Sequence, residues 1–507
     1  MLDNIITTID NWASINSDKL VYKYLEEKFT YGKLKYFSDS IADYLDFLNI
    51  KDKAPIIVYG GHKFEMLASF LGAVKSGHAY IPIDTHSPNS RISMIKAIAN
   101  PGAIIATEQL PIEVSDIPVI NPEKLSELSN KIVDYSLSHP VDGDDNFYII
   151  FTSGTTGKPK GVQISHDNVV NYINWMISDA FKLPLNISAT AQASFSFDVS
   201  GMGWITTLVK GGHLTALPRE ITNDFKKLFT MLPQLDVNTF ISTPSFAEIC
   251  LLEPSFNEKN MPNLNIFLFC GEELTISTTK KLFDRFPNAH IYNTYGPTEA
   301  TVAVTAVEIT KDLLKKGRLP IGYANPAVNI KIFDEKGNEL GTGESGEIII
   351  TGKTVSKGYM NNPEKTKKAF FMIDGIPAYH TGDLGFIDSD DLVHYLGRMD
   401  FQIKLHGYRI ELEEINHYLN NNKHIKQGVA VPKYDKDHKV AKLYAYVVPE
   451  NNDFENELQL TTTIKKELKD SMMEYMIPNK FIYKDKLPLT TNGKVNIKSL
   501  IAEVNPE

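Results

Sequence analysis

The stretch that decides the fold is a loop of glycine, hydroxyl and lysine residues that reads Phe151-Thr152-Ser153-Gly154-Thr155-Thr156-Gly157-Lys158-Pro159-Lys160-Gly161. The apolar run at residues 147–151 that leads into it predicts a buried strand. Ser165 then predicts the N-cap of a helix whose apolar residues recur at helical spacing. Such a loop suits phosphate, because glycines let the backbone approach a ligand, hydroxyls donate hydrogen bonds and lysines supply charge.

The spacing within this loop differs from that of the common P-loop. Gly154 and Gly157 lie too close together for the G-x-x-x-x-G-K-[ST] pattern, and Pro159 follows Lys158. Composition alone favours an ordinary surface loop, since glycine, serine and threonine are common there. The phosphate interpretation therefore depends on the order of the residues and on the motifs that follow.

Length and composition predict a soluble protein of two or more domains. The chain has 507 residues, which is long for a single domain. No apolar run approaches the ~20 residues of a membrane span, and the N-terminus carries acids rather than the basic cluster of a secretory signal. We expect a cytoplasmic protein without membrane insertion. Cys250 and Cys270 have no metal-ligand spacing, and no disulfide is expected there.

The net charge of −10 argues against nucleic acid as the main partner. The charge is also uneven along the chain. From residue 401 onward there are 16 Lys and Arg against 15 Asp and Glu, a net +1, so the preceding part carries −11. The C-terminal part is therefore electrostatically distinct, and the segment at residues 398–411 is the predicted domain boundary.

The first 145 residues alternate between strand and helix patterns. Residues 56–59, 79–83 and 104–106 predict strands, and residues 64–74 predict a helix. This alternation favours an open α/β sheet. Beyond the predicted boundary, residues 411–419 predict an amphipathic helix and residues 440–448 a strand.

Two motifs in the middle of the chain place chemistry beside predicted strands and helices. Asp198, among aromatic residues at 194–201, is costly to bury without a partner and is also a candidate helix N-cap. Cys270 follows a predicted buried strand, and ligands in open α/β sheets bind at the carboxyl ends of strands. A lone cysteine is usually a small buried hydrophobic residue, so we predict a pocket wall rather than a nucleophile.

The motif at residues 292–302 predicts a nucleotide site. Tyr295 offers a flat face for an adenine ring, Asn293 can hydrogen-bond the base, and Thr298 can reach a phosphate. Glu299 is a hard oxygen ligand suited to Mg²⁺. Taken alone, the same string also fits a tyrosine-rich turn that is capped by Thr298 or Glu299.

Two later motifs carry single charged residues. The motif at residues 379–385 predicts a tight turn on which Asp383 can accept hydrogen bonds from both ribose hydroxyls, although an ordinary turn aspartate is the alternative. Arg398 can bridge ribose and phosphate. Near the C-terminus, Asn492-Gly493 predicts a turn that presents Lys494 at a loop tip. A solvated lysine is the commoner outcome for such a residue.

In this order and at this spacing, the motifs are similar to those of the adenylate-forming enzymes, the family of acyl-CoA synthetases, firefly luciferase and peptide-synthetase adenylation domains. The resemblance covers essentially the whole chain. It implies an α/β fold class, with a large N-terminal adenylate-forming domain of α/β subdomains at residues 1–399. A small mobile α+β C-terminal domain at residues 400–507 would turn about a hinge near Asp400.

The same resemblance implies roles for individual residues and implies ATP and Mg²⁺ as cofactors. Lys494 is the implied catalytic lysine and also contacts nucleotide and substrate, while Glu299 is the implied metal ligand. The implied nucleotide-binding residues are Thr152, Ser153, Gly154, Thr155, Thr156, Gly157, Lys158, Asn293, Thr294, Tyr295, Gly296, Pro297, Thr298, Asp383, Tyr395, Arg398 and Lys494. The family usually continues after the lysine loop with Asp-Arg, where this chain has Asn496-Ile497. That difference puts a local cap or salt bridge in doubt, not the lysine.

Within the family, residues 243–249, 267–272, 293–305 and 401–409 are most similar to members that activate D-alanine and transfer it to the phosphopantetheine thiol of a separate carrier protein. Those members start the D-alanylation of teichoic acids. By this resemblance Asp198 pairs with the α-ammonium group of D-alanine, Val302 contacts the substrate, and Cys270 narrows the pocket around its methyl group.

Two other functions stay open. An acyl-CoA ligase for another small acid would use the same nucleotide site, but its substrate has no ammonium group for Asp198 to hold. A non-catalytic nucleotide-binding relative need not retain Lys494, Glu299 and Asp383 together, and all three are present.

Overall fold

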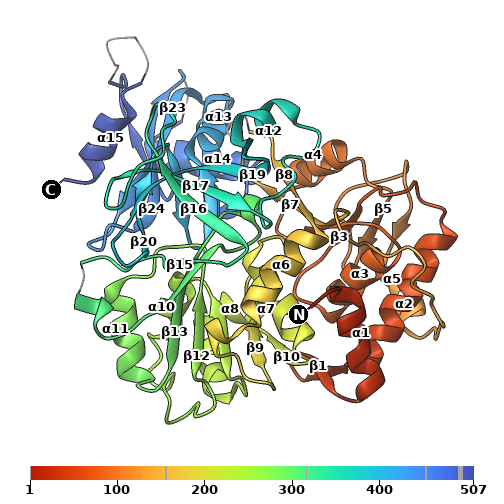
Figure 1. Ribbon diagram of the computed structural model, residues 1–507. Helices are drawn as coiled ribbons and strands as arrows, with labels where there is room; N and C mark the ends of the chain where they lie inside the picture. The colour runs from red at the N-terminus through yellow and green to blue at the C-terminus, as the bar shows by residue number, and fades with distance from the viewer. Residues whose placement is uncertain (1, 155–156, 316, 452–453, 489–494, 507) are drawn as a thin grey trace. The chain divides into compact units, whose positions relative to one another are not determined.

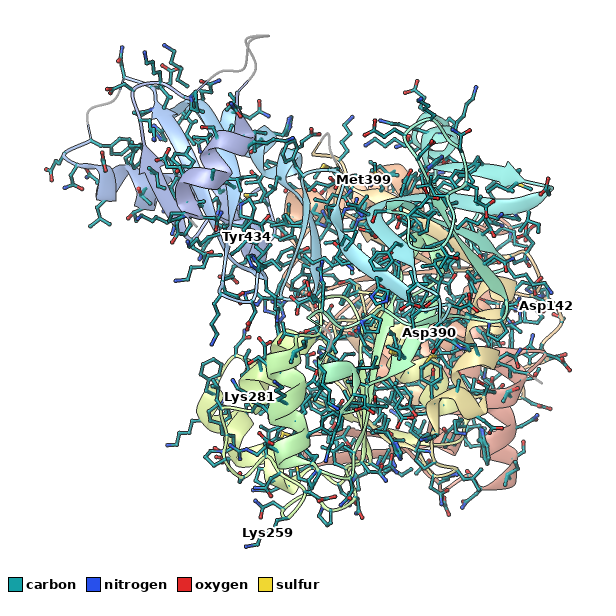
Figure 2. The ribbon with its side chains drawn as sticks, turned by 60° about the vertical axis from the view of Figure 1, so that its left-hand side comes forward. Asp142, Lys259, Lys281, Asp390, Met399 and Tyr434 are labelled. Carbon is teal, nitrogen blue, oxygen red and sulfur yellow. The ribbon has the colours of Figure 1, made fainter. Side chains whose placement is uncertain are left out.

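A computed structural model of the chain describes residues 2–154, 157–315, 317–451, 454–488 and 495–506. The chain forms two compact units. The first contains Met1–Thr85, Ile98–Phe151 and Gly161–Met399, and the second contains His86–Ala97, Thr152–Lys160 and Asp400–Glu507. Figure 1 shows their helices and strands, and Figure 2 labels Met399, the last residue of the first unit.

One sheet of the first unit supplies the edge on which the candidate site is built. Its strand order is β15-β14-β13-β12-β11-β9-β10-β1-β2, and neighbouring strands from β13 to β1 along this order run parallel. The strands are β1 (Leu20–Tyr24), β2 (Glu27–Thr30), β9 (Ser188–Ala191), β10 (His213–Ala216), β11 (Thr239–Ser242), β12 (Ile266–Phe269), β13 (His290–Tyr295), β14 (Thr305–Glu308) and β15 (Tyr323–Ala324).

Both faces of this sheet are covered by apolar side chains. Strands β11 and β12 are buried at every position, as expected for parallel strands with a layer on each side. Helix α7 (Val199–Val209) packs against β9, β10 and β11. A hydrophobic cluster that is rich in phenylalanine also packs against this sheet. It includes Phe240 and Phe267 and extends to helix α11 (Ile276–Arg285). Charged side chains such as Lys259 and Lys281 project outward from this part of the chain (Figure 2).

A second, largely parallel sheet carries the strand that leads into the phosphate loop. Its order is β6-β5-β3-β4-β7-β8. The strands are β3 (Ile56–Tyr59), β4 (Tyr80–Ile83), β5 (Ala103–Ala106), β6 (Val119–Ile120), β7 (Asn146–Thr152) and β8 (Lys160–Ser165). Helix α3 (Phe64–Lys75) connects β3 to β4 and packs against both. The predicted strands and helix in this region are therefore confirmed.

An antiparallel sheet completes the strands of the first unit that concern the site. Its order is β16-β17-β19-β18, and β20 pairs with β19. The strands are β16 (Val328–Phe333), β17 (Gly346–Gly352), β18 (Phe370–Ile373), β19 (Ile376–Ile387) and β20 (Val393–Arg398).

The second unit combines short sheets and helices, as an α+β arrangement. Its strands are β21 (Gln402–Leu405) paired with β22 (Tyr408–Glu411), and β23 (Ile425–Tyr434), β24 (Val440–Pro449) and β25 (Lys480–Tyr483) in sequence. Helix α13 (Leu412–Asn420) confirms the predicted amphipathic helix, and β24 confirms the predicted strand. The remaining helices of this unit include α14 (Glu457–Lys469) and α15 (Ile497–Val504).

The other helices belong to the first unit, except for most of α4, which belongs to the second. They are α1 (Ile5–Ile15), α2 (Tyr31–Phe47), α4 (Asn89–Ala99), α5 (Pro122–Ser129), α6 (His166–Met176), α8 (Arg219–Thr222), α9 (Phe225–Met231), α10 (Pro244–Cys250) and α12 (Pro363–Ala369), with short 3₁₀ turns between some of them. Of the helices that the structure describes, none has the length and apolar character needed to cross a membrane.

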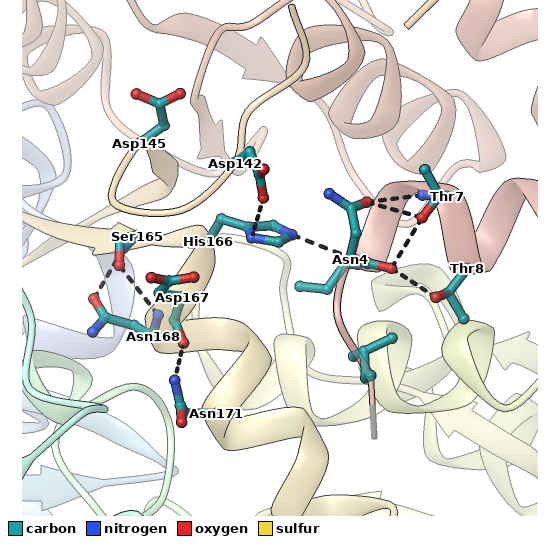
Figure 3. Close-up of polar contacts among 12 residues, drawn as sticks. Asn4, Thr7, Thr8, Asp142, Asp145, Ser165, His166, Asp167, Asn168 and Asn171 are labelled. Carbon is teal, nitrogen blue, oxygen red and sulfur yellow. Dashed lines mark hydrogen bonds and ion pairs between the residues drawn. The ribbon is translucent and has the colours of Figure 1, made fainter.

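The helix that follows β8 begins as the sequence predicts. The Ser165 side chain accepts a hydrogen bond from the Asn168 N–H at 3.1 Å, and the Asn168 side chain accepts one from the Ser165 N–H at 3.0 Å. Figure 3 shows this capping box beside the buried His166. Reciprocal bonds of this kind satisfy two backbone groups that a helix start otherwise leaves without partners.

Candidate active site

The parallel strands bring several predicted residues to one edge of the sheet. Phe269 of β12 pairs in register with Ser242 of β11 and with Asn293 of β13. Because the strands run parallel, Cys270 and the segment from Tyr295 onward leave the sheet at the same carboxyl edge. This is the edge at which open α/β sheets bind ligands.

The predicted substrate residues are close to one another in the first unit. Asp198, Cys270 and Val302 are 5%, 1% and 2% exposed. The Cys270 S–H donates to the Val302 carbonyl at 3.7 Å. The backbone of Gly201, one turn after Asp198, lies against Val302, since a Cβ built there would be 3.8 Å from Val302 Cγ2.

Asp198 does not act as a helix cap. It occupies the N-cap position of α7, but its side chain makes no capping hydrogen bond. Burial first, and then the charge of Asp198, raises the pKa of the Tyr148 hydroxyl. Burial also raises the pKa of the Tyr172 hydroxyl, and electrostatic interactions with Cys270 and Asp198 raise it further. Asp198 is thus a buried carboxylate that makes no capping hydrogen bond, and its charge contributes to the raised pKa values of two buried tyrosines.

Tyr295, Asp383 and Arg398 form a buried polar cluster. The Tyr295 hydroxyl donates to Asp383 Oδ2, and Arg398 donates to Asp383 Oδ1 at 2.7 Å and to the Thr381 carbonyl at 2.7 Å. Burial and the charge of Asp383 raise the pKa of Tyr295 well above its ordinary value, so the hydroxyl stays a donor. The ring of Tyr395 lies 6.2 Å from that of Tyr295.

The position of Asp383 corrects one prediction. The sequence predicts a tight turn at residues 379–385, but Asp383 lies within strand β19, paired with Arg398 of β20. Gly382 has a φ of +67°, and the register shifts after Leu384. The glycine therefore marks an irregularity inside a long strand, which pairing with β17, β18 and β20 holds in place.

Two other residues of the 292–302 motif donate hydrogen bonds from their side chains to backbone carbonyls, and others are closely packed or buried. Asn293 donates to the Pro320 carbonyl at 2.8 Å, and Thr294 donates to the Phe269 carbonyl at 2.8 Å. The side chain of Thr294 thus ties β13 to β12. Gly296 lies so close to its neighbours that a Cβ there would be 2.5 Å from Ala303 Cα, and Thr298 is 8% exposed. Neither Thr298 nor Glu299 caps the short turn, whose N-cap residue is Pro297.

Glu299 fits the chemistry of a magnesium ligand. It is 0% exposed, and its Oε1 accepts a hydrogen bond from the Tyr359 hydroxyl at 2.7 Å. Across the residues that the structure describes, no group of three or more His, Cys, Asp and Glu residues could hold a metal by itself. Mg²⁺ in nucleotide sites is usually held by one or two carboxylates together with the phosphates, so a single buried carboxylate is compatible with this role.

The segment Thr152–Lys160 of the phosphate loop belongs to the second unit. Within that unit, Ser153 donates to the Arg409 carbonyl at 2.8 Å, and the Gly154 N–H donates to Glu414 Oε2 at 3.0 Å. The hydroxyl oxygen of Thr152 is buried and has no hydrogen-bond partner among the described residues. The Gly154 amide thus has a carboxyl oxygen of the same unit as its acceptor, and burial raises the pKa of that carboxyl. The phosphate role of the loop stays a prediction. Lys158 is exposed.

Several predicted residues cannot be placed. Lys494 and the pair Thr155 and Thr156 lie outside the described residues. Next to the predicted lysine loop, Asn496 caps helix α15 by accepting from the Ser499 N–H at 3.1 Å. Although the chain departs from the family pattern at this position, Asn496 still caps helix α15. The hinge at Asp400 stays a prediction.

Sequence reasoning missed Tyr359, and it missed Tyr148 and Tyr172, whose pKa values the charge of Asp198 helps to raise. The hydroxyl of Tyr359 reaches Glu299 across a separation of 60 residues. Tyr148 lies in the strand that leads into the phosphate loop, so its position in the sequence could have marked it as a residue near the site. Tyr359 offered a weaker signal, since it lies outside all of the motifs that the sequence analysis identified.

Comparison with known proteins identifies the family of the chain. The family model of the AMP-binding enzyme matches residues 9–360, and that of the AMP-binding enzyme C-terminal domain matches residues 414–494. The chain is 58% identical to a D-alanine–D-alanyl carrier protein ligase of Lactiplantibacillus plantarum, with 100% of both chains covered. It is 52% identical to the ligase of the same name from Streptococcus agalactiae, also over 100% of both.

Solved structures share the fold at lower identity. The Vibrio cholerae adenylation domain AlmE, in complex with glycyl-adenosine-5′-phosphate, gives a TM-score of 0.82 at 20% identity, with 99% of this chain and 98% of that chain covered. A holo-PA1221 structure, with adenylation and PCP domains, gives 0.83 at 22% identity, over 99% and 84%. With an α/β N-terminal part, an α+β C-terminal part and family models that match both, the chain belongs to the AMP-binding enzyme family.

Proposed function

We propose that the chain activates D-alanine with ATP and transfers the D-alanyl group to the phosphopantetheine thiol of a separate carrier protein. The observation that carries this proposal is the buried carboxylate of Asp198 beside Cys270 and Val302, in a chain 58% identical over its full length to a ligase named for this reaction. A buried carboxylate is suited to pair with the α-ammonium group of an amino acid.

In the first step, a carboxylate oxygen of D-alanine attacks the α-phosphorus of ATP. A new P–O bond forms, the bond to the bridging oxygen breaks, and pyrophosphate leaves. Asp198 would hold the ammonium group, and Asp383 would accept hydrogen bonds from the ribose hydroxyls. Because a carboxylate is a weak nucleophile that the phosphates repel, most of the catalysis is positioning and neutralisation of charge.

The phosphates would be held by the loop at residues 152–160, by Lys494 and by Mg²⁺ on Glu299. When bound, Mg²⁺ neutralises charge that develops on the phosphate oxygens. The roles of Lys494 and Glu299 follow from the family resemblance and from the burial of Glu299.

In the second step, the phosphopantetheine sulfur attacks the carbonyl carbon of D-alanyl-adenylate. A C–S bond forms, the C–O bond breaks so that AMP leaves with its electron pair, and the proton of the thiol passes to solvent. We propose that the domain at residues 400–507 turns about Asp400 between the steps, which withdraws Lys494 and brings the Gly407-Tyr408 hairpin to the thiol. The wider role in teichoic acid D-alanylation stays a prediction.

ATP–pyrophosphate exchange tests the first step. We expect exchange with D-alanine, weaker exchange with L-alanine and none with butyrate. The second step is tested by mass spectrometry of a phosphopantetheinylated D-alanyl carrier protein, with the apo carrier as control. Exchange with butyrate but not with amino acids would instead indicate an acyl-CoA ligase, and nucleotide binding without any exchange would indicate a non-catalytic relative.

A further inference from the structure

Glu299 is held by a hydroxyl that the proposed function does not use. Glu299 is 0% exposed and Tyr359 is 6% exposed, and the Tyr359 hydroxyl donates to Glu299 Oε1 at 2.7 Å. A hydrogen bond from a neutral hydroxyl to an ionised carboxylate is charge-assisted and therefore strong. It fixes one oxygen of the carboxylate and limits rotation of the group.

The segment that carries Tyr359 also fixes the backbone on both sides of the carboxylate. The Ser356 N–H donates to the Glu299 carbonyl at 2.8 Å, and the Thr301 hydroxyl donates to the Thr354 carbonyl at 2.7 Å. Thr301 and Val302 have φ values of 63° and 67°, which are rare for β-branched residues. Such a backbone persists only where neighbouring contacts hold it, and it is typical of functional sites.

Tyr359 is itself rigidly placed. It forms an antiparallel bridge with Val162 of β8, the strand that leaves the phosphate loop, and its ring packs edge-on against Phe370 at 5.4 Å. Its N–H donates to the Thr366 hydroxyl at 3.0 Å. Tyr359 is therefore also held by contacts that lie outside the turn that carries Glu299.

We infer that Tyr359 is a positioning residue, which orients the Glu299 carboxylate for the divalent cation of the nucleotide complex. The inference rests on the metal role of Glu299 in the proposed function. Groups that hydrogen-bond a ligating carboxylate fix its orientation, and their loss typically weakens metal binding.

The test compares Tyr359→Phe, which removes only the hydroxyl, with Glu299→Gln and with Tyr292→Phe. Tyr292 is the matched control, because it is 1% exposed and its hydroxyl has no partner among the described residues. Mn²⁺ is the probe, and its binding to enzyme saturated with α,β-methylene-ATP is measured by electron paramagnetic resonance, corrected for Mn²⁺ on free analogue. Each variant is first checked for an unchanged melting temperature.

We expect Tyr359→Phe to weaken Mn²⁺ binding by about tenfold, the lower end of the effect of such partners. Its affinity for the analogue in EDTA should not change, and its exchange activity should recover at saturating Mg²⁺. Glu299→Gln should weaken Mn²⁺ binding further, and Tyr292→Phe should match the wild type.

Three results would overturn the inference. Wild-type Mn²⁺ affinity in Tyr359→Phe together with a loss in Glu299→Gln would leave Glu299 as a ligand but remove the positioning role. Wild-type affinity in both would remove the metal role of Glu299 itself. An equal loss in Tyr292→Phe would show that the loss of any buried hydroxyl has this effect.

Discussion

In the proposed function, Asp198 is the residue on which the choice of substrate depends most. It is 5% exposed and makes no capping bond to the helix that it begins. A carboxylate in such a place is stable when a cation pairs with it, and the α-ammonium of an amino acid is a cation of suitable size.

We predict that Asp198→Asn raises the KM for D-alanine by about a hundredfold or more, since removing one partner of a buried ion pair costs about 3 kcal/mol or more. Pyrophosphate exchange gives the KM, and calorimetry with ATP alone serves as the control, which should not change. An unaltered KM for D-alanine would mean that another group holds the ammonium.

Asp383 is a predicted site residue whose hydrogen-bond partners the sequence did not indicate. The sequence indicated a carboxylate for the ribose, but it did not indicate that the Tyr295 hydroxyl and Arg398 would hold its two oxygens. Tyr295 and Asp383 are 88 residues apart, and no local pattern specifies such a pair. Motifs thus indicated which residues are candidates, whereas the partners of those residues depend on the tertiary structure.

A second prediction follows from that pair. Tyr295→Phe keeps the flat face for adenine but removes the hydroxyl, so Asp383 should lose orientation. We expect the KM for ATP to rise about tenfold, the lower range for a hydrogen bond to a charged group. With 2′,3′-dideoxy-ATP, which cannot use Asp383, variant and wild type should differ much less. An equal rise with both nucleotides would assign the hydroxyl a general structural role.

At the scale of elements, short apolar runs and caps were predictable because they are local. Strand β3 and helix α6 begin where the sequence indicates. Strand β19 was not predictable, because its Gly382 resembles a turn signal and its strand character depends on three neighbouring strands. Local chemistry specifies an element only where tertiary pairing does not compete with it.

Helix α6 also carries a buried group that titrates. His166 is 0% exposed, its Nε2 accepts from the Ile5 N–H at 3.3 Å, and its Nδ1 lies 3.4 Å from Asp142 (Figure 3). Burial lowers the pKa of His166 below its ordinary value, although Asp142 opposes this. Protonation would place a hydrogen on the Nε2 that accepts from Ile5, so the folded state favours the neutral ring.

We therefore predict that stability falls as pH decreases below about 6.5, the ordinary pKa of histidine. The unfolded state binds the proton there and the folded state does not, so the contribution of His166 is fully present above that pH and decreases towards its lower folded pKa. His166→Asn should reduce the slope of unfolding free energy against pH by up to about 1.4 kcal/mol per pH unit.

Urea unfolding between pH 5 and 8 measures this slope. The exposed His438, replaced by Asn, is the control and should keep the wild-type slope. Part of the dependence of the unfolding free energy on pH should remain in either variant. It comes from three other histidines whose pKa values burial also lowers, His62, His78 and His213. An identical slope in His166→Asn and wild type would mean that His166 titrates alike in both states.

At the scale of the whole molecule, the charge difference along the chain indicated a distinct C-terminal part, and the second unit resumes at Asp400. The sequence did not indicate that the short segments His86–Ala97 and Thr152–Lys160 group with that part. Membership of a compact unit depends on contacts between distant residues, which composition and periodicity do not contain.

The last prediction concerns Lys494, which we propose to act in adenylate formation but not in transfer to the carrier protein. If Lys494 acts only while the adenylate forms, Lys494→Ala should slow pyrophosphate exchange by about 10²–10³-fold, the effect of losing one preorganised donor to developing charge. Transfer of the D-alanyl group from supplied D-alanyl-adenylate to the carrier protein should fall far less, because the lysine would then be withdrawn from the site. Lys486→Ala, which removes an exposed charge from the same region, is the control and should leave both rates unchanged. An equal loss in both half-reactions would show that Lys494 serves both steps from one arrangement, and alternation about Asp400 would then lose its main support.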